Sequence, residues 1–140
     1  MRVMVILKAS RNSEAGVMPK QEDIEKTIRF NEEMVKAGIL KGADGLKPSK
    51  FGKRVFYRPN SKQSVVDGPF AETKELVAGY WIWEVKSMDE AIAWAKKIPN
   101  TDNEEFLVEL RAIAGPDDFG DAYTDEIRER EERMRAQLPQ

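Results

Sequence analysis

The chain has 140 residues, of which 41% are hydrophobic and 34% charged, so it suits one globular domain and is too short for two ordinary ones. It contains neither Cys nor His, which excludes disulfides, thiolate nucleophiles, imidazole bases and metals held by those side chains. Residues 1–116 carry 19 Lys and Arg against 17 Asp and Glu, and residues 117–140 carry 4 against 8. Neither part has the concentrated positive charge that a phosphate backbone requires, so we expect no direct nucleic-acid partner.

The first predicted element is a strand at residues 2–9, in which Val3 begins one apolar face and Met4 and Ile6 lie on the other. The apolar run within this strand is far too short for a signal peptide core or a transmembrane helix. We therefore expect a cytoplasmic protein with no membrane partner.

Residues 10–18 are predicted to form a loop, and a helix is predicted from Pro19 to a C-cap at Gly38. Proline fits the first position of a helix, and the acidic residues that follow suit the helix dipole. The predicted apolar face of this helix consists of Ile24, Ile28 and Val35, with Phe30 and Met34 on its flank.

The middle of the chain predicts a weak strand at 39–46 and a hairpin with arms at 54–58 and 63–66. The loop that follows, from Asp67 to Glu75, reads Asp-Gly-Pro-Phe-Ala-Glu-Thr-Lys-Glu. Strand pairing should stop near Pro69, because proline has no N–H group to donate. A loop with this much charge beside an apolar side chain is either a rigid joint or the edge of a site.

Residues 77–85 form the strongest predicted strand, with an aromatic centre. A second helix is predicted after Ser87, which would form a capping box with Glu90, and Pro99 should end it. The last predicted strand covers residues 106–113.

The order strand, helix, strand, strand, helix, strand predicts an α+β fold of the ferredoxin-like kind, an antiparallel sheet with two helices on one face. The strands carry apolar side chains on both faces, so the face without helices needs a second cover. We expect that cover to be a second protomer in a homodimer. Residues 124–138 predict a highly charged helix with a sparse apolar stripe, which we expect to be an extension of the domain.

Five segments carry a family resemblance: Met4-Val5-Ile6-Leu7, Gly38 with Gly42-Ala43-Asp44-Gly45-Leu46, Asp67 to Glu75, Gly79-Tyr80-Trp81-Ile82, and Asp89-Glu90-Ala91 with Ile98-Pro99. With them the chain resembles the YCII-related superfamily, and in particular the subgroup named for its Asp-Gly-Pro-Phe motif. The resemblance covers residues 1–114 and predicts a YCII-related domain there, followed by a C-terminal helical extension at 115–140.

The resemblance implies a ferredoxin-like dimer of the dimeric α/β-barrel type. Some relatives in the wider superfamily act on small aromatic-derived lactones or chlorinated quinols through a His–Asp pair. That site cannot be carried over, because this chain has no His. Members of the subgroup also occur beside, or fused to, extracytoplasmic-function sigma factors, which implies a regulatory context.

Asp67 is the candidate catalytic residue, since acid–base chemistry must come here from carboxylates, Lys, Tyr or water. It is either a turn residue that closes on nearby backbone N–H groups or a pocket carboxylate with a raised pKa. The candidate substrate-binding residues are Glu72, Lys74, Tyr80 and Arg54. The structural alternative is a solvated ion pair for Glu72 and Lys74 and a solvated strand edge for Arg54. For Tyr80 it is a half-buried strand position in which the hydroxyl group only satisfies its own hydrogen bond.

Two functions remain open at this point. The first is a small-molecule-binding or enzyme-like domain of lyase or isomerase type that acts through carboxylates on a small anionic or aromatic ligand, with no metal and no cofactor. The second is a non-catalytic interaction module associated with sigma-factor-type transcription regulation. It rests on the missing His and Cys and on the acidic terminal helix.

Overall fold

The computed structural model describes residues 1–71 and 73–139. Along the chain it contains β1 (Arg2–Lys8), α1 (Arg11–Glu14), α2 (Gln21–Lys36), β2 (Leu40–Gly45), β3 (Lys53–Phe56), β4 (Ser64–Asp67), β5 (Val77–Glu84), α3 (Met88–Ala95), β6 (Val108–Ala112) and α4 (Asp125–Ala136). Three 3-10 helices lie at Ser49–Phe51, Thr73–Glu75 and Pro116–Ala122.

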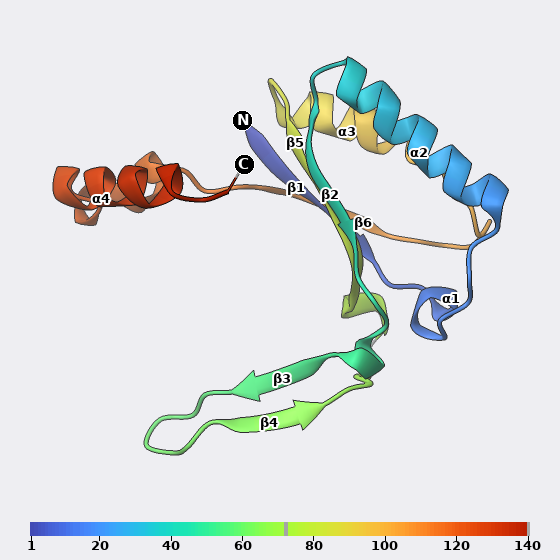
Figure 1. The fold of residues 1–140 in the computed structure, drawn as a ribbon, viewed down its shortest axis with the longest axis horizontal. Helices are drawn as coiled ribbons and strands as arrows, with labels where there is room; N and C mark the ends of the chain where they lie inside the picture. Colours follow the sequence, from blue (N-terminus) through green and yellow to red (C-terminus); the bar gives the residue numbers. More distant parts are fainter. Residues whose placement is uncertain (72, 140) are drawn as a thin grey trace.

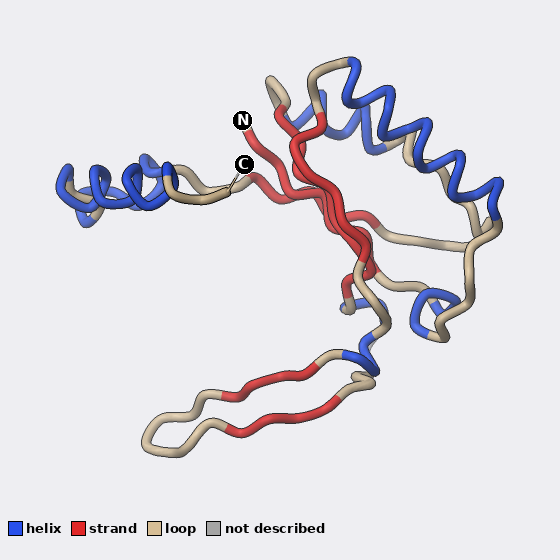
Figure 2. Tube along the Cα trace, in the orientation of Figure 1, coloured by secondary structure: helices blue, strands red, loops and turns tan. Residues whose placement is uncertain are grey.

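Four strands form one antiparallel sheet in the order β2-β5-β1-β6, and β3 and β4 form a separate hairpin. The central pairing of β1 with β5 sets Val5 opposite Trp81 and Met4 opposite Ile82. Helices α2 and α3 lie on one side of this sheet (Figures 1 and 2). The predicted α+β, ferredoxin-like arrangement is therefore confirmed, and the predicted C-terminal helix is present as α4.

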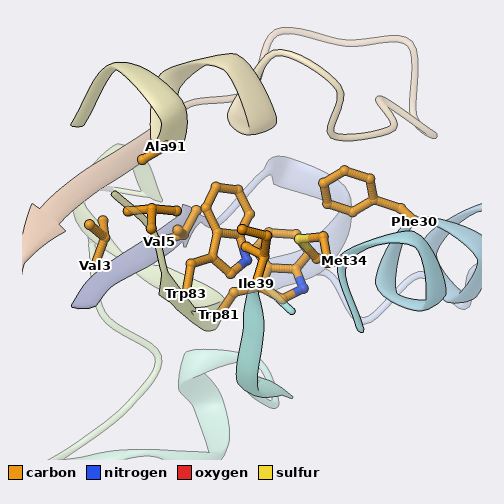
Figure 3. Packing of buried hydrophobic residues seen from close by; sticks show 9 residues of the cluster. Val3, Val5, Phe30, Met34, Ile39, Trp81, Trp83 and Ala91 are labelled. Atoms are coloured by element: carbon orange, nitrogen blue, oxygen red, sulfur yellow. The ribbon is translucent and has the colours of Figure 1, made fainter. Parts of the chain in front are cut away.

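The core lies between the sheet and the two helices, and its centre is aromatic (Figure 3). Phe30 of α2 meets Trp81 and Trp83 edge-on, with ring centroids 6.0 and 6.5 Å apart. Val3, Val5, Met34, Trp83 and Ala91 are fully buried. The sequence pattern of β1 and β5 thus places one face of each strand in this core.

The predicted apolar face of α2 was wrong. Phe30 and Met34 are buried, whereas Ile24, Ile28 and Val35 are 49%, 49% and 62% exposed. One residue along a helix turns its side chain by about 100°, so only one stripe of α2 can meet the sheet. The two tryptophans fix that stripe, because the long side chains of Phe30 and Met34 fill the space above them.

Two local predictions also need correction. The predicted loop at 10–18 contains the short helix α1, which Ser10 and Ser13 hold with a reciprocal capping box. Helix α2 begins after the N-cap Lys20, so Pro19 lies just outside it. None of the helices in the described part of the chain has the length and apolar character needed for a bilayer span.

Two arms leave the core, and both extend on the side of the sheet opposite α2 and α3 (Figure 1). We call residues 50–67, which contain the β3–β4 hairpin, the hairpin arm. We call residues 116–139, which contain α4, the C-terminal arm. Among the described residues of both arms, no side chain is buried.

Candidate functional site

A cavity of about 340 Å³ lies on the helix side of the sheet, at the end where β1 stops and β5 begins. The ends of these strands, the middle of α2 and the connection from α3 to β6 line it. A volume of this size is at the lower end of the range for small-molecule sites, about 300–1,000 Å³. Its apolar wall is formed by Leu7, Ala43, Gly79, Trp81, Ile98 and Phe106.

Helix α2 contributes the polar side chains Asn31 and Thr27 to the cavity. Asn31 accepts a hydrogen bond at Oδ1 from Trp81 Nε1 at 2.9 Å, which leaves its Nδ2 group as a donor for a ligand. The Thr27 hydroxyl donates to the backbone oxygen of Asp23 at 3.2 Å, so its remaining capacity is as an acceptor. Asn31 therefore links the core to the cavity.

The charges around the cavity are mainly negative. Among the described residues of the lining, Lys8 is the only cationic one, against the acidic residues Asp102, Glu104 and Glu105 of the connection before β6. Asp44 also belongs to the lining, but its side chain lies on the other face of the sheet. An acidic lining disfavours an anionic ligand and suits a neutral or cationic one with N–H or O–H donors.

Tyr80 and Asp44 border this cavity from the sheet itself. The Tyr80 hydroxyl donates to Asp44 Oδ2 at 2.9 Å, and this hydrogen bond, with the charge of Asp44, raises the pKa of Tyr80. Side chains alternate along a strand, so both point to the face opposite Trp81. The pair keeps the phenol protonated on the open face of the sheet.

Two other candidates from the sequence lie on the hairpin arm, away from the cavity lining. Asp67 ends β4 and pairs with Lys53 Nζ at 2.5 Å, and its side chain is 74% exposed. The Arg54 guanidinium lies 3.9 Å from the centroid of the Phe70 ring. The exposed ion pair favours the structural interpretation of Asp67.

The two remaining candidates belong to the segment after the motif. Lys74 is exposed in the 3-10 helix at Thr73–Glu75. Glu72 lies outside the described residues. The structure thus places Tyr80 at the cavity and Asp67 and Arg54 on the hairpin arm, and it does not bring these three side chains together.

The Asp-Gly-Pro-Phe motif fastens the base of the hairpin arm. Gly68 N donates to Gly52 O at 2.9 Å, and Phe70 N donates to Ser49 Oγ at 3.0 Å. The carboxylate of Glu14 accepts from Ser49 N at 2.9 Å and also from the Ser49 hydroxyl. A Cβ at residue 68 would stand 1.8 Å from Ser49 O, so the backbones approach as only glycine allows. The loop from Asp67 to Glu75 was expected to be either a rigid joint or the edge of a site, and these contacts favour the rigid joint.

Sequence reasoning missed Asn31, Thr27 and the acidic connection before β6. One signal was available for Asn31, a polar residue between Phe30 and Met34 on what proved to be the buried stripe of α2. The connection had no comparable signal, because an acidic loop is the ordinary composition of a surface turn. In the described part of the chain, no group of three or more His, Cys, Asp or Glu is placed to hold a metal ion.

Comparisons with known proteins identify the family of the chain. The family model of the YCII-related domain matches residues 1–114. An uncharacterised protein, R00369 of Rhizobium meliloti (strain 1021), is 30% identical over 114 residues, which cover 78% of this chain and 90% of that protein.

One solved structure to which the chain is similar is 5-chloro-2-hydroxyhydroquinone dehydrochlorinase (TftG) from Burkholderia phenoliruptrix AC1100, in complex with 2,5-dihydroxybenzoquinone. It is 14% identical with a TM-score of 0.44, and the match covers 82% of this chain and 96% of that one. The family match over most of the chain is the decisive finding. The chain belongs to the family of proteins with a YCII-related domain.

Proposed function

We propose that the chain binds a small, neutral, ring-shaped molecule with hydroxyl or amino donors in the cavity beside Asn31. The observation that carries this is the lining, in which Trp81 and Phe106 offer apolar surface while Glu104 and Glu105 offer acceptors. Apolar surface combined with polar side chains that can form hydrogen bonds is typical of sites that orient one ligand. Of the anionic or aromatic ligand expected from the sequence, the acidic lining favours an aromatic one, a phenol or an aromatic amine.

An enzymatic role at this cavity would be of lyase or isomerase type, in which a proton moves between a carboxylate and the ligand. Glu104 and Glu105 are better placed for this than Asp67, because they line the cavity while Asp67 lies on the hairpin arm, outside the lining. Tyr80 would serve by holding Asp44 and the strand ends in place, since their hydrogen bond spans β2 and β5.

Thermal unfolding tests the proposal with two matched variants of α2. Thr27→Phe fills the cavity from a helix position, and Ile28→Phe adds a ring at the next residue, which is 49% exposed and outside the lining. We expect neutral phenols and aromatic amines to raise the Tm of wild type and Ile28→Phe, but not of Thr27→Phe. Aromatic carboxylates such as benzoate should give a smaller shift than these ligands in wild type and Ile28→Phe.

Equal shifts in both variants would place the ligand elsewhere. A panel that shifts none of the proteins would contradict a small-molecule site and favour the non-catalytic interaction module.

We also propose that the protein is a cytoplasmic homodimer that belongs to the Asp-Gly-Pro-Phe subgroup. The support for a dimer is the sheet face opposite the helices, where Met4, Ile6 and Ile82 are only partly exposed although no helix covers them. A second copy of this face would exclude water from all three side chains. The support for the subgroup is the motif itself, Asp67 to Phe70.

A further inference from the structure

The two arms carry equal and opposite charge. The hairpin arm has five basic residues and one acidic residue, a net charge of +4. The C-terminal arm has four basic and eight acidic residues, a net charge of −4. Both extend on the same side of the sheet, yet no ion pair among the described residues of one protomer joins them. Each arm is thus a charged surface, and the surface of opposite charge belongs to the same chain.

One face of the hairpin arm holds its guanidinium groups on aromatic rings. Arg54 lies over Phe70 at 3.9 Å and Arg58 lies over Phe56 at 5.7 Å, measured from Cζ to the ring centroid. Arg54 and Phe56 share a face of β3, because side chains alternate along a strand. A guanidinium held on a ring keeps its N–H donors in one plane and is pre-organised for carboxylates.

One face of α4 is acidic. Asp125, Glu129 and Glu132 are spaced by four and three residues, which places them on the same side of a helix, and all three are exposed. Two of the arginines beside this face are engaged within the arm, whereas Arg133 lies one turn after Glu129. Arg128 pairs with Asp117 at 3.5 Å, and Arg135 pairs with Glu131 at 2.6 Å. The acidic face is therefore not neutralised by these two arginines.

The two faces also match in length. Arg54 and Arg58 are at most about 14 Å apart along an extended chain. Seven residues of α-helix, the separation of Asp125 and Glu132, span about 10.5 Å. Two guanidinium groups within about 14 Å of each other can therefore both face this length of helix.

Two apolar side chains share the Arg54 face of the hairpin arm. Phe56 alternates with Val55 along β3, Val66 lies opposite Arg54 on β4, and Phe56 and Val66 are 41% and 45% exposed. An arm docked on this face would shield both from water, which adds a non-polar contribution to the ion pairs.

We propose that, in the homodimer, the hairpin arm of each protomer lies on the C-terminal arm of its partner, with Arg54 and Arg58 against Asp125, Glu129 and Glu132. The molecule that binds each arm is thus a second copy of this chain. The inference rests on the homodimer proposed above and adds that the segment beyond the YCII-related domain takes part in assembly.

Two charge-reversal variants test this pairing. The first is Arg54→Glu with Arg58→Glu, and the second is Asp125→Lys with Glu129→Lys and Glu132→Lys. Each alone sets like charges against each other at both arm contacts, so we expect the dimer dissociation constant in sedimentation to rise about tenfold or more at low salt. A control with Lys26→Glu and Lys36→Glu on the exposed surface of α2 should leave the constant unchanged.

Mixing the two reversal variants gives the decisive result. In the mixed dimer each hairpin arm meets a C-terminal arm of opposite charge, so the heterodimer should form with nearly wild-type affinity. This rescue requires contact between protomers, because a contact within one protomer would stay repulsive in both variants.

A dimer that both reversals leave unchanged would overturn the arm pairing while the homodimer stands. A wild-type monomer would overturn both. Binding of wild type, but not of Arg54→Glu/Arg58→Glu, to phosphatidylserine vesicles or to duplex DNA, with an unchanged dimer, would assign the hairpin arm to a polyanion instead.

Discussion

The sheet with α2 and α3 differs from the two arms in how each uses its apolar residues. All ten buried hydrophobic residues among those described lie in residues 3–39 and 76–91, and neither arm contributes one. The arms nevertheless carry large apolar side chains, such as Phe56 and Met134. The core completes its own burial within one protomer, whereas the arms do not.

Each arm consists of regular secondary structure that has little stability by itself. An isolated two-stranded hairpin is marginally stable in water, and so is a single helix of 12 residues such as α4. Packing against another surface is the usual source of the missing stability. The contrast with the core therefore indicates that the arms are built to be covered by something outside their own protomer.

The largest expected effect is a difference in the free energy of unfolding between substitutions on the two faces of α2. The buried face of this helix was predicted wrongly from the sequence. Met34 is fully buried, so Met34→Ala should lower the free energy of unfolding by about 2–5 kcal/mol. Val35 is 62% exposed, so Val35→Ala should change it by less than about 0.5 kcal/mol. Urea denaturation followed by circular dichroism measures both, and similar losses would show that α2 packs through the predicted face after all.

The next effect lies at the joint between the core and the hairpin arm. A side chain at Gly68 would collide with the backbone of Ser49, so Gly68→Val should destabilise the protein by about 2–3 kcal/mol. Gly45→Ala is the control, since a Cβ there meets no atom within 4 Å. A silent Gly68→Val in the same denaturation assay would mean that the joint is loose and that the arm has no fixed direction.

A smaller effect is expected where the core meets the cavity. Asn31→Leu removes the acceptor of the Trp81 indole N–H and should cost about 1–2 kcal/mol. Asn31→Asp keeps an acceptor at the same place and should cost less at neutral pH. If the leucine variant is as stable as wild type, the hydrogen bond does not support the core, and Asn31 serves only the cavity.

Removal of the C-terminal arm tests the contrast directly, with a small effect on the core. Truncation after Pro116 deletes no buried residue, so the truncated chain should stay folded. Its far-UV circular dichroism should lose the signal of α4 and keep that of the core. An insoluble or unfolded product would show that the core depends on this arm.

The smallest expected effect is at the residue that the sequence marked as a candidate acid–base group. The Asp67 side chain is 74% exposed and pairs with Lys53, which is also exposed, so Asp67→Asn should cost less than about 1 kcal/mol. The ligand-induced shift in Tm should stay unchanged. Loss of that shift at wild-type stability would instead restore Asp67 as a pocket carboxylate.

The sequence predicted the fold because the strong patterns lie in the core. Alternation in β1 and β5, Gly38 at the end of α2 and the N-cap Ser87 of α3 are local signals that tertiary packing did not override. The face of α2 was not predictable, because Ile24, Ile28 and Val35 have the same spacing as a buried stripe. Only the position of Trp81 and Trp83 in the sheet decides which stripe is buried.

The candidate site was less predictable for a related reason. The motif at Asp67 is conspicuous in sequence, but its backbone contacts show a joint. The cavity is formed by residues from α2, the strand ends and the connection before β6, which are far apart in the chain. No short motif marks such a site, since its geometry arises only when the helix lies on the sheet.

Multi-angle light scattering of the full-length chain at micromolar concentration tests the central claim, that the arms and the open sheet face are covered by a second copy. We expect a mass of twice the 16.0 kDa of the chain. A mass of 16.0 kDa, with the circular dichroism of a folded protein, would contradict the claim, because the arms would then be ordered without any cover.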